Sequence, residues 1–130
     1  MTQAASVTAA LLVIGDEILS GRTKDQNIGY IADYLTKIGI GLREVRIVGD
    51  VTAEIVAAVN ALRARYDYLF TTGGIGPTHD DITAGAVAAA LDVEISEDPR
   101  AVKLLLEHAR NAKIRSLLRS IKMRECKSEI

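Results

Sequence analysis

The chain has 130 residues, of which 48% are hydrophobic and 25% charged, and its formal net charge is −1. This balance predicts one globular domain with an aliphatic, alanine-rich core, because Trp is absent and Phe occurs once. The single cysteine, Cys126, excludes an internal disulfide and a cysteine-based zinc site, which favours a cytoplasmic protein. We expect no membrane partner, because there is no recognisable secretory signal and the longest apolar run, residues 9–14, is too short to cross a bilayer.

Charge is distributed unevenly along the chain. Residues 1–109 carry nine Lys or Arg and fifteen Asp or Glu, whereas residues 110–130 carry seven Lys or Arg and two Glu. The acidic body argues against a nucleic-acid partner. We predict a leader over residues 1–8, a domain over residues 9–110 and a basic, helical tail over residues 111–130. The tail has an apolar stripe that suits packing on the domain or on a second subunit, and its basic residues alternatively suit an anionic partner.

The predicted elements begin with a strand over residues 10–15, an apolar run of the kind that helices cover on both faces. A polar loop follows over residues 15–24. Residues 27–38 carry an apolar stripe at helical spacing and predict a helix, for which Asp25 or Asn27 is a suitable cap.

The middle of the chain repeats this arrangement. Residues 42–48 alternate as a half-exposed strand does, and residues 52–65 predict a second helix that Thr52 can cap. A third strand over residues 68–72 runs into a pair of glycines.

The last third of the chain is mainly helical in this interpretation. An alanine-rich helix over residues 81–91 opens at Asp81 or two residues later. Residues 93–95 are a candidate short strand. Asp98, which precedes a proline, predicts the start of a helix over residues 99–118.

Strands that alternate with helices predict an α/β fold, a three-layer α/β/α sandwich with a mainly parallel sheet. In such sheets ligands bind beyond the carboxyl ends of the strands. The polar loops that follow the three predicted strands contain Gly15-Asp16-Glu17, Gly49-Asp50 and Gly73-Gly74. We therefore expect these loops to meet at one edge of the sheet and to form a binding site.

The loop Gly73-Gly74-Ile75-Gly76-Pro77 links a strand to a helix. Glycines permit positive φ and let a ligand approach the backbone, and free N–H groups at a helix start favour an anion such as phosphate. The spacing is neither that of a Rossmann fingerprint nor that of a Walker A loop. A tight turn that binds nothing is the alternative interpretation.

Acidic side chains surround this loop in the predicted fold. Asp80 and Asp81 begin a helix, where a carboxylate usually acts as a cap. Because two adjacent residues cannot both cap, one of them is free for Mg²⁺. Asp16, Glu17 and Asp50 would add carboxylates from neighbouring strand ends, and a cation with a phosphate would relieve their mutual repulsion.

Other polar residues of these loops are weaker candidates. His79 is either a general acid or base or, as we favour, a loop residue that faces water. Ser20 and Thr78 can bond a phosphate or the edge of a heterocycle. The sequence contains no recognisable serine triad or cysteine nucleophile.

Three segments together resemble a known family. Residues 15–22 (Gly-Asp-Glu-Ile-Leu-Ser-Gly-Arg) and 25–27 (Asp-Gln-Asn, where the family typically has Asp-Thr-Asn) resemble the first motif of the CinA (competence/damage-inducible protein A) N-terminal domain. Residues 48–50 resemble its second motif, and residues 72–83 (Thr-Gly-Gly-Ile-Gly-Pro-Thr-His-Asp-Asp-Ile-Thr) resemble the third. The MoaB, Mog and MoeA proteins share a looser version of this set. The resemblance covers about residues 8–110, and it identifies the chain as a member of the MoaB/Mog molybdopterin-binding family, nearest to the CinA branch.

The resemblance implies a domain that binds molybdopterin or an adenine nucleotide with Mg²⁺, in molybdenum cofactor biosynthesis or in hydrolysis of ADP-ribose-like pyrophosphates. By motif position it implies that Asp50 and Asp81 are catalytic. With the acidic loops above, the predicted metal ligands are Glu17, Asp50, Asp80 and Asp81. The predicted ligand-binding residues are Gly15, Asp16, Ser20, Thr72, Gly73, Gly74, Gly76, Pro77 and Thr78.

The resemblance ends near residue 110. The family continues with an Asn-Pro segment, an Ala-Pro-Gly-Phe-like strand and a Pro-Gly-x-Pro loop, whereas Pro99 is the last proline of this chain. We therefore expect a domain that is incomplete at its C-terminal side, with an exposed sheet edge. A homodimer or homotrimer would cover that surface. A non-catalytic binding or assembly module remains the alternative to a magnesium-dependent enzyme.

Overall fold

Three parallel strands form the sheet of this protein. They are β1 (Thr8–Ile14), β2 (Gly41–Val48) and β3 (Tyr68–Thr72), in a computed structural model that describes residues 6–76, 78–79 and 81–108. β1 lies in the centre and pairs in parallel with both neighbours, so that the order is β2-β1-β3. The parallel sheet and the positions of its three strands are therefore confirmed.

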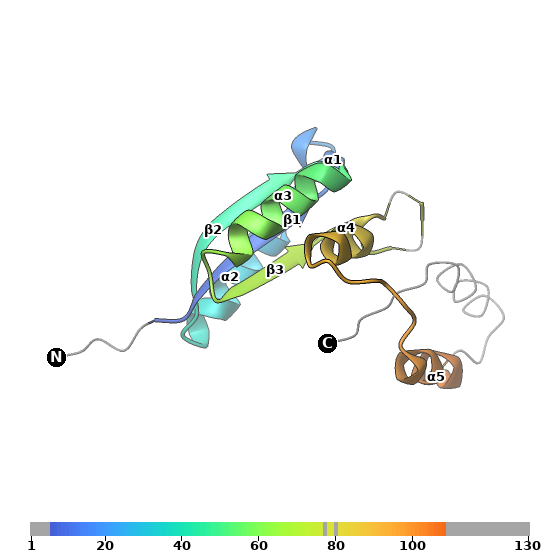
Figure 1. Cartoon of the computed structure of the whole chain (residues 1–130). Coiled ribbons are helices and arrows are strands. Elements are labelled where there is room, and N and C mark those ends of the chain that lie inside the picture. The colour runs from blue at the N-terminus through green and yellow to red at the C-terminus, as the bar shows by residue number, and fades with distance from the viewer. Residues whose placement is uncertain (1–5, 77, 80, 109–130) are drawn as a thin grey trace.

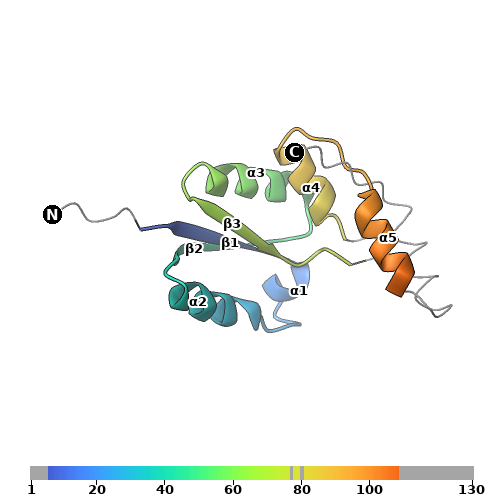
Figure 2. The ribbon, with the colours of Figure 1, turned by 90° about the horizontal axis from the view of Figure 1, so that it is seen from below.

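Helices cover both faces of this sheet (Figures 1 and 2). α2 (Asn27–Lys37) and the short α1 (Asp16–Leu19) lie on one face, and α3 (Thr52–Arg63) and α4 (Thr83–Ala90) lie on the other. α5 (Pro99–His108) lies beyond α4, away from the sheet. The arrangement confirms the predicted three-layer sandwich. In the described part of the chain, no helix has the length and apolar character that a membrane span requires.

The two crossover connections place β2 and β3 on opposite sides of the central strand β1. The chain passes from β1 through α2 to β2 on one side, and then through α3 to β3 on the other side of β1. The two crossover helices accordingly lie on opposite faces (Figure 2). This reversal creates a crevice beyond the carboxyl ends of β1 and β3, which is where open α/β sheets bind their ligands.

The core explains why β1 is central. From Ala9 to Ile14 its side chains are at most 3% exposed, because helices cover both of its faces. Each large apolar side chain buried in this way contributes roughly 1.5–3 kcal/mol. The main cluster joins β1 to α3 and α4 and consists of Ala10, Leu12, Ile14, Ile55, Ala58, Val59, Leu62, Ala86 and Ala90.

Two helix starts agree with the sequence analysis. The Asp25 carboxylate accepts a hydrogen bond of 2.8 Å from the N–H of Ile28 at the start of α2. Asp98 accepts one of 2.8 Å from the N–H of Arg100 at the start of α5. The Arg100 side chain, together with this N–H, lowers the pKa of Asp98 to about 2.

Other details of the predicted elements were wrong. Thr52 is already the first residue of α3 and makes no capping bond. The predicted polar loop over residues 15–24 contains the helix α1. Residues 93–95 form no strand, because Asp92 takes a φ of 53° and the N–H of Val93 closes the end of α4 on the carbonyl of Ala88 at 3.0 Å.

The exposed face of β2 also differs from a simple alternation of polar and apolar residues. Val45 and Ile47 are 37% and 38% exposed, whereas the charged Glu44 between the sheet and α3 is half-buried. Glu44 pairs with Arg46 and accepts a 2.8 Å hydrogen bond from the hydroxyl of Tyr66, and both contacts lower its pKa. Of the predicted helix over residues 99–118, the structure describes the part up to His108, and the predicted tail lies outside the described residues.

Candidate functional site

The loops after β1 and β2 are tied to each other by two reciprocal hydrogen bonds. The N–H of Asp16 donates to Oδ2 of Asp50, and the N–H of Asp50 donates to Oδ1 of Asp16, both at 3.1 Å. The N–H of Gly15 also donates to the carbonyl of Val48 at 3.0 Å. A Cβ at position 49 would lie 2.5 Å from Oδ1 of Asp16, so this close approach requires Gly49. Two carboxylates from different loops are thereby fixed side by side.

The loop after β3 is shaped by the pair Gly73-Gly74. Their φ angles are 91° and 61°, in the region that favours glycine. A Cβ on Gly73 would lie 1.9 Å from the carbonyl oxygen of Ile14, and one on Gly74 would lie 2.3 Å from Oγ1 of Thr83. The buried Thr83 hydroxyl donates to the carbonyl of Gly73 at 2.8 Å, and its N–H donates to Gly74 at 3.2 Å. The glycine turn is therefore held tightly against the end of β1.

Asp81 belongs to a turn of its own. Its Oδ2 accepts hydrogen bonds from the N–H and the hydroxyl of Thr78, at 3.0 and 2.7 Å. The N–H of Asp81 donates back to the carbonyl of Thr78 at 3.1 Å. Asp81 does not cap α4, which begins at Thr83 without a side-chain cap. Of the two interpretations of Asp81, a helix cap or a residue left over for other contacts, the structure excludes the cap.

The three loops meet at a cavity of about 550 Å³ beyond the carboxyl ends of the strands. We call it the acidic cavity, because four carboxylates line it. It is formed by Asp16, Glu17, Arg22, Asp50, Gly74, His79, Asp81 and Ile82. The arrangement brings negative charge from all three loops to one place and adds two basic side chains that suit a phosphate.

A second cavity of about 430 Å³ lies on the α2 side of the same strand ends. We call it the α2-side cavity. It is lined by Val13, Ile14, Glu17, Ile18, Thr23, Lys24, Asp25, Gln26, Asn27, Thr72 and Gly73. Glu17 lines both cavities, and the adjacent Gly73 and Gly74 line one each. The two cavities are therefore neighbours across the crevice between β1 and β3.

Most of the predicted site residues lie at one of these cavities or beside it. Ser20 and Thr78 line neither cavity and make hydrogen bonds within their own loops: the Ser20 hydroxyl accepts from Nε of Arg22 at 3.2 Å, and Thr78 bonds Asp81. Pro77 and Asp80 lie outside the described residues.

Sequence reasoning missed Arg22 as a site residue and favoured a water-facing role for His79, yet both line the acidic cavity. It also missed residues 23–27 as cavity walls. Arg22 could have been found from the sequence, because it is a basic residue in a group of loops that are otherwise acidic.

The donor set of the acidic cavity suits a particular kind of metal site. Among the residues whose placement is described, no three His, Cys, Asp or Glu side chains form a group that could hold a metal ion. Mg²⁺, however, is usually held by one or two carboxylates together with water and substrate phosphates. The neighbouring carboxylates of Asp16 and Asp50 fit that pattern, in which the metal arrives with a phosphate.

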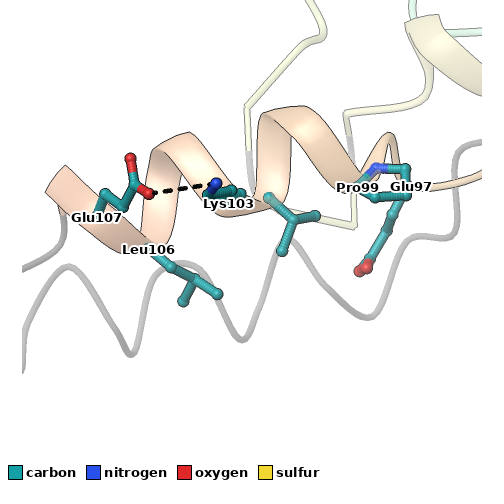
Figure 3. Close-up of a pocket in the computed structure, with 6 residues that line it drawn as sticks. Glu97, Pro99, Lys103, Leu106 and Glu107 are labelled. Atoms are coloured by element: carbon teal, nitrogen blue, oxygen red, sulfur yellow. Dashed lines mark ion pairs between the residues drawn. The ribbon is translucent and has the colours of Figure 1, made fainter.

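A third hollow lies on α5 and is unrelated to the strand ends (Figure 3). Val102 and Leu106 form its apolar part, and Lys103 and Glu107 form an ion pair at 4.0 Å beside it. Few polar groups converge there, so it lacks the features of a small-molecule site.

A parallel sheet with helices on both faces and a polar crevice at the reversal of strand order defines an α/β ligand-binding domain. The chain belongs to the family described as "Probable molybdopterin binding domain", which matches residues 10–119. This result confirms the resemblance to the MoaB/Mog family.

The chain is similar to longer proteins that carry different names. A "CinA-like protein" of Desulfosudis oleivorans is 45% identical over 93 residues, which cover 72% of this chain and 22% of that protein. A "Probable FAD synthase" of Caenorhabditis elegans is 47% identical over 83 residues, which cover 64% of this chain and 16% of that protein. The chain thus spans less than a quarter of the length of these two relatives.

Solved structures agree with this family membership. The crystal structure of CinA from Thermoplasma acidophilum, whose function is given as unknown, superimposes with a TM-score of 0.76 at 29% identity, over 84% of this chain and 64% of that one. MoaB from Thermus thermophilus superimposes with a TM-score of 0.64 at 21% identity, over 85% of this chain and 70% of that one, and at that identity shows a shared fold.

Proposed function

We propose that this domain binds a phosphorylated heterocycle as its magnesium complex and that an ADP-ribose-like pyrophosphate is its preferred ligand. The alternative ligand within the family is molybdopterin, with a role in molybdenum cofactor biosynthesis. The observation that supports the proposal most directly is the acidic cavity, where loops from three strands contribute Asp16, Glu17, Asp50 and Asp81. Magnesium balances such a charge best when a phosphate accompanies it.

Each part of the acidic cavity has a role in this proposal. The glycine turn at Gly73 and Gly74 lets a phosphate approach the backbone closely, because a Cβ has no room there. Asp50 is proposed to hold the metal with Asp16 or Glu17 beside it. Bound magnesium would neutralise charge on the phosphate oxygens during hydrolysis.

The basic residues of the acidic cavity complete the proposed site. The guanidinium of Arg22 is kept near the cavity by its bond to Ser20, and it is suited to bind a phosphate. His79 is proposed to donate or accept a proton at the scissile pyrophosphate, since an imidazole ring has one nitrogen that can donate a proton and one that can accept it. The name of one relative, "Probable FAD synthase", agrees with a ligand of this class, because FAD is itself a pyrophosphate that joins two heterocycles.

Titration calorimetry with ADP-ribose tests the proposal. We expect binding that depends on Mg²⁺, and we expect Asp50→Asn to weaken it at least tenfold because a charged metal ligand is removed. Asp33→Asn is the matched control, since this carboxylate pairs with Lys37 on the exposed side of α2. Equal affinity with and without magnesium in the parent protein would count against the metal site.

A non-catalytic binding module is the second candidate. It is favoured by the turn at Asp81, whose Oδ2 accepts two hydrogen bonds from Thr78 and so serves the local structure of its own loop. Product analysis after incubation with ADP-ribose and Mg²⁺ separates the two candidates. Release of AMP and ribose 5-phosphate supports the enzyme, and tight binding without products supports the module.

We also propose that the domain forms a homodimer or homotrimer. Among the described strands, β3 is an edge of the sheet, and its Tyr68 and Phe70 rings stack at 6.3 Å while 53% and 36% exposed. Exposed edges and aromatic patches of this kind are usually covered in soluble proteins. A single monomeric species in sedimentation velocity at high micromolar concentration would rule this out.

A further inference from the structure

One polar atom at the crevice has no role in the fold. Oγ1 of Thr72, the last residue of β3, is buried and has no hydrogen-bond partner in the described part of the chain. Buried hydroxyls are nearly always paired, so an orphaned one at a strand end needs an explanation. Thr72 lines the α2-side cavity, where a ligand atom could supply the missing partner.

The walls of this cavity differ in character. Thr72 pairs with Val13 of the neighbouring strand β1. Leu69, three residues before Thr72 on β3, packs against the core on the α3 side. Because side chains alternate along a strand, Thr72 projects on the α2 side. Apolar side chains of Val13 and Ile18 form one part of the wall.

The remaining wall is polar. It comes from residues 23–27, the segment that leads into α2, and includes the side chains of Lys24, Gln26 and Asn27. Asp25 in this segment is occupied by its bond to the N–H of Ile28. A cavity that combines apolar side chains with amide and hydroxyl groups suits a flat heterocycle whose edge carries hydrogen-bonding atoms.

The position of this cavity relates it to the acidic cavity. Thr72 and Gly73 line the α2-side cavity, and the next residue, Gly74, lines the acidic cavity. A ligand whose phosphate lies at the glycine turn would therefore have room for the rest of the molecule in either of the two cavities. Four carboxylates make the acidic side unsuitable for an uncharged ring.

We propose that the α2-side cavity holds the heterocycle of the ligand and that the Thr72 hydroxyl is a specificity-determining group that hydrogen-bonds the ring edge. This inference rests on the proposed function, which places the phosphate and the metal in the acidic cavity. It divides the ligand between the two cavities and assigns the ring to the side that faces α2.

The substitution Thr72→Val tests this inference, because it removes the hydroxyl and keeps the shape. With Mg²⁺ present, we expect AMP to bind Thr72→Val roughly tenfold more weakly than it binds the parent protein. Ribose 5-phosphate, which carries the phosphate but no ring, should bind both proteins equally. Thr72→Ser, which keeps a hydroxyl, should retain most of the affinity for AMP.

Stability gives a second readout. Removing an unpaired buried hydroxyl should leave the urea midpoint of Thr72→Val unchanged or raise it. A lower midpoint would show that Thr72 has a structural partner and would overturn the inference. Equal weakening of AMP and ribose 5-phosphate would overturn it too, because the effect would then lie at the phosphate.

The parent protein distinguishes failure of this inference from failure of the proposed function. If it binds ribose 5-phosphate and binds AMP no more tightly, the heterocycle is not held in the α2-side cavity, and the phosphate site stands. If it binds neither compound nor pyrophosphate with Mg²⁺, the proposed function is wrong and the inference falls with it.

Discussion

The edge of the sheet that forms the crevice is built by two different means. Between the loops after β1 and β2, Asp16 and Asp50 exchange hydrogen bonds between N–H groups and carboxylates. After β3, the turn at Gly73 and Gly74 depends on missing side chains and on the hydroxyl of Thr83. The first support consists mainly of hydrogen bonds, with one close approach at Gly49. The second is steric and tolerates almost no added volume.

The largest effect should come from adding one methyl group to the steric support. In Gly73→Ala the new Cβ would lie 1.9 Å from the carbonyl oxygen of Ile14, at a φ of 91°. The clash and the backbone strain together should lower the free energy of unfolding by at least about 3 kcal/mol. Urea denaturation followed by circular dichroism measures this change.

Gly39→Ala provides the matched control. Gly39 has a φ of 83° after the end of α2, and a Cβ there would meet nothing within 4 Å. It should lose only the ~1–2 kcal/mol of left-handed backbone strain. Equal losses in the two variants would show that strain alone, without the contact to Ile14, accounts for the turn.

Thr83→Val should have a smaller effect on the same turn. It replaces the 2.8 Å hydrogen bond to the carbonyl of Gly73 with a methyl group of similar size at a residue that is 2% exposed. We expect a loss of about 1–2 kcal/mol in the free energy of unfolding. Thr83→Ser, which keeps the hydroxyl, should lose less. The hydrogen bond is unimportant if valine and serine prove equally stable.

The contact between Asp16 and Asp50 should depend on which atoms the side chain at position 16 carries and not on its volume. Asp16→Ala removes the acceptor of the N–H of Asp50 and should lower the free energy of unfolding by about 1 kcal/mol. Asp16→Asn keeps an oxygen there and also removes a negative charge from the acidic cavity, so its stability should be within about 0.5 kcal/mol of the parent. An asparagine variant as unstable as the alanine variant would mean that the charge itself matters.

The smallest effect concerns a carboxylate at the opposite end of the sheet. Asp67 accepts hydrogen bonds of 2.8 Å from the N–H and 3.0 Å from the hydroxyl of Thr8, and these lower its pKa below the ordinary value of 3.8. Its contribution to stability is therefore complete above its pKa in the unfolded chain and is lost as the pH falls through the lower pKa of the folded state.

Asp67→Asn should accordingly make the loss of stability in acid less steep, from about pH 5 downward. The measurement is a series of urea midpoints in this range for both proteins. Parallel curves would show that the contacts with Thr8 do not stabilise the ionised form.

The sequence was a good guide wherever a pattern was local. The strand at β1 was predicted because an uninterrupted apolar run must be buried on both faces, and the start of α5 because Asp98 precedes a proline. The expectation that three loops meet needed only the rule that parallel strands end at one edge. These inferences require no knowledge of which distant residues are in contact.

The sequence failed where a residue had several possible partners. Either Asp80 or Asp81 could have capped a helix, and Asp81 instead bonds Thr78, three residues earlier. Residues 93–95 were a candidate strand, but the N–H of Val93 ends α4. Arg22 was overlooked at the acidic cavity because its position depends on how the chain folds after α1. In each case the outcome depends on the local geometry of the folded loop, which the sequence pattern does not contain.

The central position of β1 also has a consequence for how the molecule assembles. Both partners of β1 are made later in the chain, and Thr8 meets Asp67 across 59 residues of sequence. Pairings this distant fold slowly, because the intervening chain must be ordered before the contact forms. β2, α2 and α3 can cover part of β1 first, but its pairing with β3 and its contact with α4 must wait until those elements have emerged, and until then that side of the most apolar strand is open to aggregation.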